Sequence, residues 1–161
     1  MTATIQVLLL QVRDHDDPMR PQEVECFRRV LNNDSLVIET HNLLEVPLTK
    51  SLIDRTDVFF IGGSGDYSAA VDADWLERTL DSLRMLHDRR QRLFASCWGF
   101  QAMARALGGL VVKDPEHAEL GTREVELTDA GIADPVFGPL GSPFYAQMGH
   151  EDVVAELPPG A

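Results

Sequence analysis

Several features are scarce in this sequence of 161 residues, and each absence excludes a class of protein. Basic residues are few, because 14 Lys and Arg stand against 26 Asp and Glu, which gives a formal net charge of -12. Since phosphate backbones are bound by clustered Lys and Arg, this balance argues against a nucleic-acid partner. No apolar run reaches about eighteen residues, and no basic segment precedes an apolar stretch. The sequence therefore predicts neither a membrane span nor a signal peptide, and we expect a cytoplasmic location.

Cysteine and nucleotide-binding motifs are scarce as well. Of the two cysteines, Cys26 falls on an amphipathic segment and is assigned no role. The glycine-rich residues 62–65 are not followed by Lys-Ser or Lys-Thr and lack the Gly-x-Gly-x-x-Gly spacing, which excludes a Walker loop and a dinucleotide fingerprint. Residues 13–20 contain aspartates and a histidine, but no second group of ligands accompanies them, so a solvated loop is favoured over a metal site. We expect no metal and no organic cofactor.

Short apolar runs alternate with amphipathic segments along the chain. Runs of strand length are followed by segments with helical spacing, and the predicted strands are residues 5–10, 36–40, 57–61, 93–95, 110–112, 124–127 and 143–147. The predicted helices are residues 21–31, 72–90 and 98–107, with a short helical or irregular piece at 48–54. In the first helix, the spacing predicts that Val24, Phe27, Val30 and Leu31 face the core. In the second helix, it predicts one apolar side opposite alternating charges, made of Trp75, Leu76, Leu80, Leu83 and Leu86. This alternation is typical of an α/β fold with a parallel sheet.

Cys97 stands at a strand-to-helix turn. A short apolar run at residues 93–95 precedes it, and the helical pattern that follows is closed by Gly108. This arrangement predicts a nucleophile elbow, in which Gly99 gives room for close backbone approach and the positive end of the helix points at the sulfur. An isolated cysteine in an apolar segment is otherwise a small core residue, so the interpretation depends on the surrounding motif.

Three segments together resemble the class I glutamine amidotransferase family. Residues 97–101, Cys-Trp-Gly-Phe-Gln, resemble its nucleophile motif Cys-x-Gly-x-Gln, and residues 60–65, Phe-Ile-Gly-Gly-Ser-Gly, lie upstream. Residues 148–161 resemble the segment Ser-His-Gly-Asp-x-Val-x-x-Leu-Pro-x-Gly, and the likeness is closest to free-standing, GMP-synthase-like members. The resemblance implies a single domain over residues 1–161. It also implies a flavodoxin-like three-layer sandwich with a mainly parallel central sheet, a nucleophile elbow and a few extra antiparallel strands.

The same resemblance implies a glutaminase, which splits the side-chain amide of glutamine through a cysteine thioester and releases ammonia for transfer. Its site residues carry over onto matching positions: Cys97 as nucleophile, the amides of Gly63 and Trp98 as oxyanion hole, and Gln101, Gly149 and His150 as substrate-binding residues. The implied substrate is glutamine or a γ-glutamyl compound. A synthetase subunit is the implied partner that receives the ammonia.

The base of the reaction has no clear counterpart. The family supplies it with its carboxylate as a His-x-Glu pair, typically His-Pro-Glu, and no His-Pro-Glu occurs in this sequence. His117 and Glu119 have that spacing but lie in a turn-rich stretch, so the match is taken as accidental. We favour a C-terminally truncated chain that lacks the base. The alternative is that His150, paired with Asp152, is recruited as the base.

A truncated chain leaves apolar surface uncovered, so we expect association into a homo-oligomer or marginal stability. Two other functions also stay open at this point. One is a non-catalytic or regulatory module related to the enzyme. The other is a different elbow-thiol hydrolase that acts on γ-glutamyl compounds.

Overall fold

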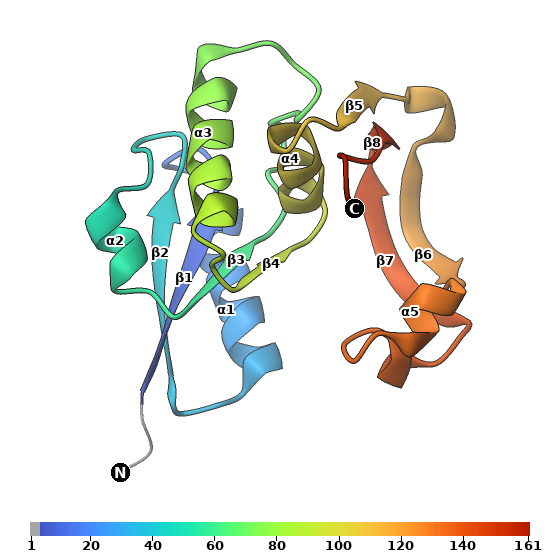
Figure 1. Cartoon of the computed structure of the whole chain (residues 1–161), viewed down its shortest axis with the longest axis horizontal. Helices are drawn as coiled ribbons and strands as arrows, with labels where there is room; N and C mark the ends of the chain where they lie inside the picture. The colour runs from blue at the N-terminus through green and yellow to red at the C-terminus, as the bar shows by residue number, and fades with distance from the viewer. Residues whose placement is uncertain (1–3) are drawn as a thin grey trace. The chain divides into compact units, whose positions relative to one another are not determined.

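The computed structural model describes residues 4–161, and its backbone divides into two compact units (Figure 1). Unit 1 consists of Met1–Lys113 and Asp152–Ala161, and unit 2 is Asp114–Glu151. The expectation of a single domain stays a prediction. None of the helices within residues 4–161 is long and apolar enough to cross a membrane.

Unit 1 is built on a four-stranded parallel sheet with the order β2-β1-β3-β4. Its strands are β1 (Ile5–Gln11), β2 (Leu36–Asn42), β3 (Val58–Ile61) and β4 (Leu93–Ala95). The centre of β1 is a continuous apolar run because helices cover both faces of this strand. The strand order reverses at β1, which lies between β2 and β3. The carboxyl ends of β1 and β3 therefore border the crevice where open α/β sheets bind their ligands.

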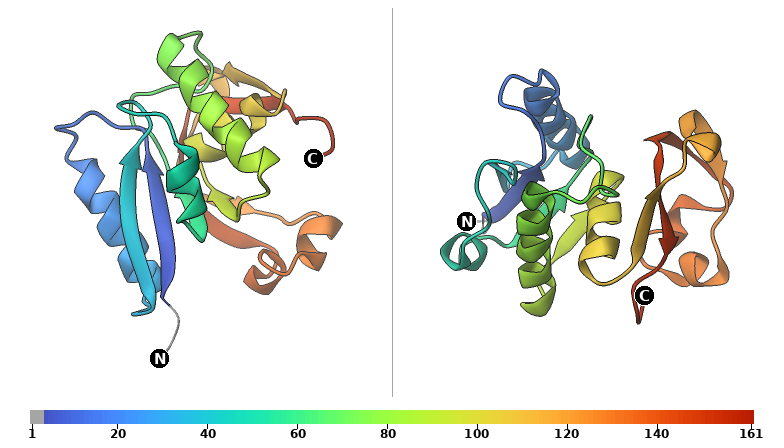
Figure 2. Two further views of the ribbon diagram at one scale, coloured as in Figure 1. Left: turned by 60° about the vertical axis from the view of Figure 1, so that its left-hand side comes forward. Right: turned by 90° about the horizontal axis from the view of Figure 1, so that it is seen from above.

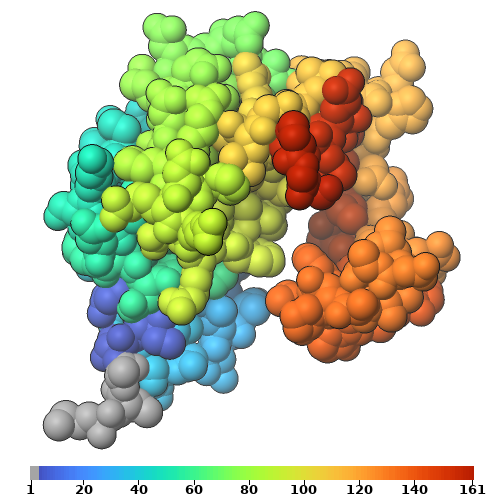
Figure 3. Space-filling model, in the orientation of Figure 1, coloured from blue at the N-terminus to red at the C-terminus, as the bar shows by residue number. Residues whose placement is uncertain are grey.

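Helices cover both faces of this sheet. They are α1 (Met19–Leu31), α2 (Lys50–Asp54), α3 (Asp74–Asp88) and α4 (Trp98–Ala106). Figure 2 shows α1 on one face and α3 with α4 on the other, and in the space-filling view of Figure 3 the atoms of α3 lie next to those of the β4–α4 segment. The predicted flavodoxin-like three-layer sandwich is thus confirmed.

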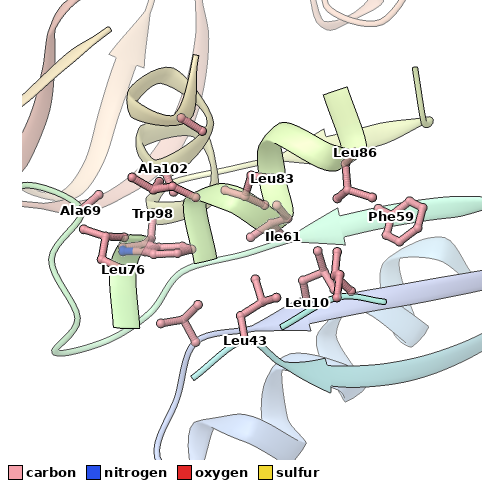
Figure 4. Packing of buried hydrophobic residues seen from close by; sticks show 14 of the residues in the cluster. Leu10, Leu43, Phe59, Ile61, Ala69, Leu76, Leu83, Leu86, Trp98 and Ala102 are labelled. Carbon is pink, nitrogen blue, oxygen red and sulfur yellow. The ribbon is translucent and has the colours of Figure 1, made fainter. Parts of the chain in front are cut away.

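The main core lies between the sheet and the pair α3 and α4 (Figure 4). Phe59 and Ile61 of β3 are at most 1% exposed, and they face Leu83 and Leu86 of α3. The amphipathic face predicted for α3 is therefore confirmed, although the helix is two residues shorter than predicted at each end. Trp98 adds the first residue of α4 to the same core. The core thus anchors both the turn after β3 and the start of α4.

The predicted face of α1 is partly wrong. The helix begins at Met19, two residues before the predicted start, and Val30 is 81% exposed. Its inner face follows Glu23, Phe27 and Leu31 at spacings of four residues, and Val30 lies about 100° away from Leu31 around the helix. The aromatic ring of Phe27 packs on Phe60 of β3, with 5.3 Å between centroids. A charged residue, Glu23, therefore occupies a buried position that the apolar pattern did not indicate.

Antiparallel strands accompany the parallel sheet, as predicted. In unit 1, β5 (Leu110–Lys113) pairs with β8 (Asp152–Glu156), a strand that the sequence analysis did not predict. In unit 2, β6 (Glu119–Val125) pairs with β7 (Phe144–His150). The short helices of unit 2 are η1 (Pro115–His117), α5 (Asp129–Ala133) and η2 (Gly138–Leu140). β6 begins five residues before its predicted start. The prediction missed the first half of this strand because that half carries no apolar alternation in the sequence.

Truncation of Leu83, whose exposed fraction is 0%, is expected to lower the free energy of unfolding by about 3 kcal/mol, because the lost methyl groups leave a cavity. Urea unfolding followed by circular dichroism measures the change for Leu83→Ala. Val30→Ala is the matched control, since this side chain is 81% exposed, and its effect should stay below about 0.5 kcal/mol. Equal losses in the two variants would contradict the assignment of the core.

Candidate active site

Cys97 occupies a strained turn between β4 and α4. Its backbone has φ 52° and ψ -119°, in a region that residues other than glycine adopt at a cost of about 1–3 kcal/mol. Two hydrogen bonds hold the turn against the end of β3: Ser96 N donates to Ile61 O at 3.0 Å, and Gly99 N donates to Gly62 O at 3.0 Å. The side chain is exposed. The predicted nucleophile elbow is therefore present.

Gly99 makes this close approach feasible. A Cβ atom at this position would lie 2.7 Å from Cβ and 2.8 Å from the carbonyl oxygen of Ile61. Both distances are shorter than non-bonded atoms tolerate, and one partner is main chain that cannot move aside. The elbow thus requires glycine two residues after the cysteine for steric reasons.

The turn after β3 lies beside the thiol. A Cβ atom built on Gly63 would lie 3.8 Å from Cys97 Sγ, so the structure brings together the two residues that the sequence assigned to nucleophile and oxyanion hole. Trp98, the other predicted donor, is 2% exposed, and its ring stacks on Trp75 with 6.4 Å between centroids. This packing fixes the first turn of α4. The oxyanion roles of both amides stay predictions.

A pocket of about 420 Å³ opens at the carboxyl ends of β1 and β3. Its walls are residues 13–14 and 16–19 after β1 and residues 64–67 after the glycine turn. Tyr67 Oη donates to Asp14 Oδ1 at 2.6 Å and so joins the two walls, and this hydrogen bond raises the pKa of Tyr67. The sequence analysis predicts a solvated loop for residues 13–20, because sequence alone cannot show that these residues face the turn after β3.

Asp17 anchors the first wall. Its Oδ1 accepts from Met19 N at 2.7 Å and its Oδ2 accepts from Arg13 Nη1 at 3.0 Å. These bonds, that of Met19 first and then that of Arg13, hold the pKa of Asp17 below its ordinary value of 3.8. Within residues 4–161, no group of three or more His, Cys, Asp or Glu side chains is placed to hold a metal ion.

Gln101 is buried, with 7% of its surface exposed, and its Nε2 donates to the carbonyl oxygen of Asp152 at 2.7 Å. The structure thus gives Gln101 a bond that joins α4 to β8, while its predicted contact with substrate stays a prediction. The carboxylate of Asp152 accepts from Ser68 Oγ at 2.7 Å and from Ala69 N at 2.9 Å. Asp152 is therefore a structural link to the loop after β3, which no local pattern in the sequence could indicate.

The remaining predicted residues, Gly149 and His150, end strand β7 of unit 2. His150 Nε2 lies 3.0 Å from Glu119 Oε2, on the residue directly opposite in β6. The suggested pairing of His150 with Asp152 is therefore wrong, because the Asp152 carboxylate is engaged in unit 1 and Glu119 takes its place. His117 Nδ1 lies 2.9 Å from Asp114, so His117 and Glu119 form no pair. Gly149 is exposed.

Substitution Gly99→Ala is expected to destabilise the fold by several kcal/mol, because the added methyl group overlaps Ile61 in the elbow. Chemical unfolding measures the loss. Gly149→Ala is the matched control, since a Cβ atom there meets no atom within 4 Å in the described residues. A neutral effect of Gly99→Ala would show that the elbow is looser than these distances indicate.

The low pKa of Asp17 makes its stabilising effect dependent on pH. A carboxyl group whose pKa is lower in the folded state stabilises the protein above its ordinary pKa of 3.8, and this contribution is lost as pH falls through the folded-state value. Unfolding free energies of the unmodified chain and of Asp17→Asn should therefore differ at neutral pH and converge as the pH falls below 3.8 and through the lower folded-state pKa. A difference that stays constant over this range would contradict the assignment.

Comparison with known proteins agrees with this geometry. A sequence model of the family "Glutamine amidotransferase class-I" matches residues 22–161. The chain is 32% identical over 108 residues to glutamine amidotransferase-like protein chyE of Penicillium rubens, a match that covers 66% of this chain and 45% of that protein. It is 30% identical over 119 residues to gamma-glutamyl peptidase 4 of Arabidopsis thaliana, which covers 73% of this chain and 47% of that protein.

The fold is shared with solved structures. A crystal structure of a glutamine amidotransferase from Thermotoga maritima superposes with a TM-score of 0.70 at 17% identity, over 92% of this chain and 61% of that one. The chain spans less than half the length of the two relatives from Penicillium rubens and Arabidopsis thaliana. Because the family model covers most of its residues, the chain belongs to the class I glutamine amidotransferase family.

Proposed function

We propose that this chain supplies the nucleophile of a glutaminase, which hydrolyses the side-chain amide of glutamine and releases ammonia for transfer to an acceptor. The observation that carries the proposal is the Cys97 elbow with Gly63 beside the sulfur. Gln101, Gly149 and His150 are the proposed substrate-binding residues. A synthetase partner is the proposed acceptor of the ammonia.

The reaction follows from the chemistry of an unactivated amide. The Cys97 thiolate attacks the amide carbon, and a carbon–sulfur bond forms while negative charge gathers on the former carbonyl oxygen. The amides of Gly63 and Trp98 donate to that oxygen, and one such donor typically contributes about 3 kcal/mol. The carbon–nitrogen bond breaks as the nitrogen takes a proton, and ammonia leaves. Water then cleaves the thioester to give glutamate and restore the thiol.

The reaction also needs a group that accepts the thiol proton and returns it to the leaving nitrogen. His150 is the candidate within this chain, and Glu119 at 3.0 Å holds its imidazole in one orientation. The sequence pattern suggested Asp152 for this role, but the carboxylate of Asp152 accepts from Ser68 Oγ and Ala69 N instead. The alternative proposal is that a residue outside this sequence supplies the base.

A second substrate class is favoured by the pocket beside the turn. Ammonia as leaving group needs no space of its own, whereas about 420 Å³ at the carboxyl ends of β1 and β3 can hold a larger amine. The relative named gamma-glutamyl peptidase 4 also supports γ-glutamyl compounds as substrates. A non-catalytic module is the third alternative, and it predicts that Cys97 is dispensable.

Covalent labelling tests the proposal. A chloroketone analogue of glutamine should label Cys97, and free glutamine should slow the labelling, because both ligands occupy the same site. Intact-mass and peptide analysis locate the label, and Cys97→Ser should abolish it. Cys26→Ser is the matched control, since Cys26 is the other exposed cysteine and should have no effect.

Ammonia release from glutamine completes the test. Activity in the unmodified chain that falls about a thousandfold or more in Cys97→Ser supports the hydrolase and assigns the base to this chain, with His150→Gln as the next variant. Labelling without turnover means that the base lies elsewhere. Labelling of Cys97 that glutamine does not slow, or that equals the labelling of Cys26, contradicts the proposed function.

A further inference from the structure

A group of buried polar side chains lies at the carboxyl ends of β1 and β2, and none of them takes part in the reaction steps proposed above. Gln11, Arg13, Glu23 and Asn42 are all less than 10% exposed. They are held together by hydrogen bonds rather than by apolar packing. Since isolated charges are costly to bury, charged residues at such positions are normally paired.

Arg13 is the centre of this group. Its Nε donates to Glu23 Oε2 at 3.4 Å, and its Nη1 donates to Asp17 Oδ2 at 3.0 Å. Glu23 Oε2 also accepts from Gln11 Nε2 at 2.8 Å, and the Arg13 carbonyl accepts from Asn42 Nδ2 at 2.7 Å. Two carboxylates and a fixed backbone thus hold one planar guanidinium in a single orientation.

A buried ion pair of this kind adds little to the stability of a fold. The desolvation cost of a buried ion pair often equals or exceeds its attraction, so apolar residues of similar volume would serve the fold equally well. The side chains of Arg13 and Glu23 are nevertheless each only 9% exposed. Stability alone therefore does not explain the pair, and its surroundings indicate a further role.

The ion pair lies directly against the glycine turn. A Cβ atom on Gly62 would lie 2.1 Å from Glu23 Oε1, and one on Gly63 would lie 3.9 Å from Arg13 Nη2. On Gly65 it would lie 3.3 Å from Arg13 Nη1. The carboxylate and the guanidinium therefore border three glycines of the turn that carries the proposed oxyanion donor.

The glycine turn also contacts Cys97 and the elbow around it. The same Cβ position on Gly63 is 3.8 Å from Cys97 Sγ, and Gly62 O accepts from Gly99 N at 3.0 Å. A continuous set of contacts thus runs from the ion pair through the turn to the elbow. Catalytic groups must be held closely, because a displacement of about 1 Å can reduce a rate by about a hundredfold.

We propose that Arg13, held by Glu23, is a positioning residue that fixes the glycine turn against the Cys97 elbow, so that the Gly63 amide meets the oxyanion. This inference rests on the proposed function, because it concerns the acyl-transfer step of the same site. It adds two residues, Arg13 and Glu23, that act through the glycine turn that they border. Their effect should therefore be confined to reactions that form an oxyanion.

Two reactions of Cys97 separate this role from a general loss of structure. Acylation by a γ-glutamyl p-nitrophenyl ester passes through an oxyanion, and its leaving group departs without taking a proton. This reaction therefore needs the base only to form the thiolate, a step that it shares with alkylation. Alkylation by iodoacetamide displaces iodide directly and forms no oxyanion. In Arg13→Met, the acylation rate constant should fall about tenfold to hundredfold with little change in KM, while the alkylation rate changes less than about threefold.

Conservative variants are included because Arg13→Met could unfold the protein. Glu23→Gln keeps the shape of the side chain and should give a smaller selective loss of acylation, and Arg13→Lys should recover only part of the rate because ammonium cannot reproduce the planar fork. Arg55→Met is the matched control, since Arg55 pairs with Glu39 at the surface, where the two side chains are 61% and 50% exposed. Circular dichroism melts confirm that each variant is folded.

The outcomes are distinguishable. A selective loss of acylation in both Arg13→Met and Glu23→Gln supports the inference. Equal acylation in these variants and the unmodified chain, or a parallel loss of acylation and alkylation, overturns it and leaves the proposed function intact. If the unmodified chain is not acylated at Cys97 at all, the proposed function fails and the inference fails with it.

Discussion

The arrangement of the nucleophile depends on one steric constraint, which is how closely the first turn of α4 can approach the end of β3. Gly99 lies so near Ile61 that no side chain fits, and its amide reaches the carbonyl oxygen of Gly62. This contact places Cys97 above the sheet edge and beside Gly63. The core behind it, from Phe59 to Trp98, keeps strand and helix at this distance. The position of the sulfur is thus a consequence of backbone packing.

The parts of the fold that were predicted correctly are those encoded by neighbouring residues. The apolar run of β1, the face of α3 and the strand-to-helix turn at Cys97 each follow from spacing within about fifteen residues. Glycine at positions 62, 63 and 99 marked the turns because close approach of two backbones leaves few other choices. The predicted nucleophile and its neighbour Gly63 accordingly lie together in the structure.

The features that were missed depend on polar partners that no periodic spacing relates. Glu23 looks like a surface residue of α1 until Arg13 and Gln11 surround it, and Glu119 acquires His150 as neighbour only through the pairing of β6 with β7. Polar networks of this kind have no period, so an apolar pattern cannot reveal them. Val30 is exposed, contrary to the prediction, because the inner face of α1 follows Glu23, Phe27 and Leu31. Sequence patterns therefore locate apolar faces better than polar partners.

The backbone of Cys97 has a consequence for how this family can diverge. At φ 52°, glycine would relieve the strain that a side chain imposes, so the most stable residue at this position is one without a thiol. A lineage released from the need for a nucleophile would gain stability by the exchange, and few mutational steps separate the two residues. Cysteine at this position is thus held at a cost in stability that glycine would avoid.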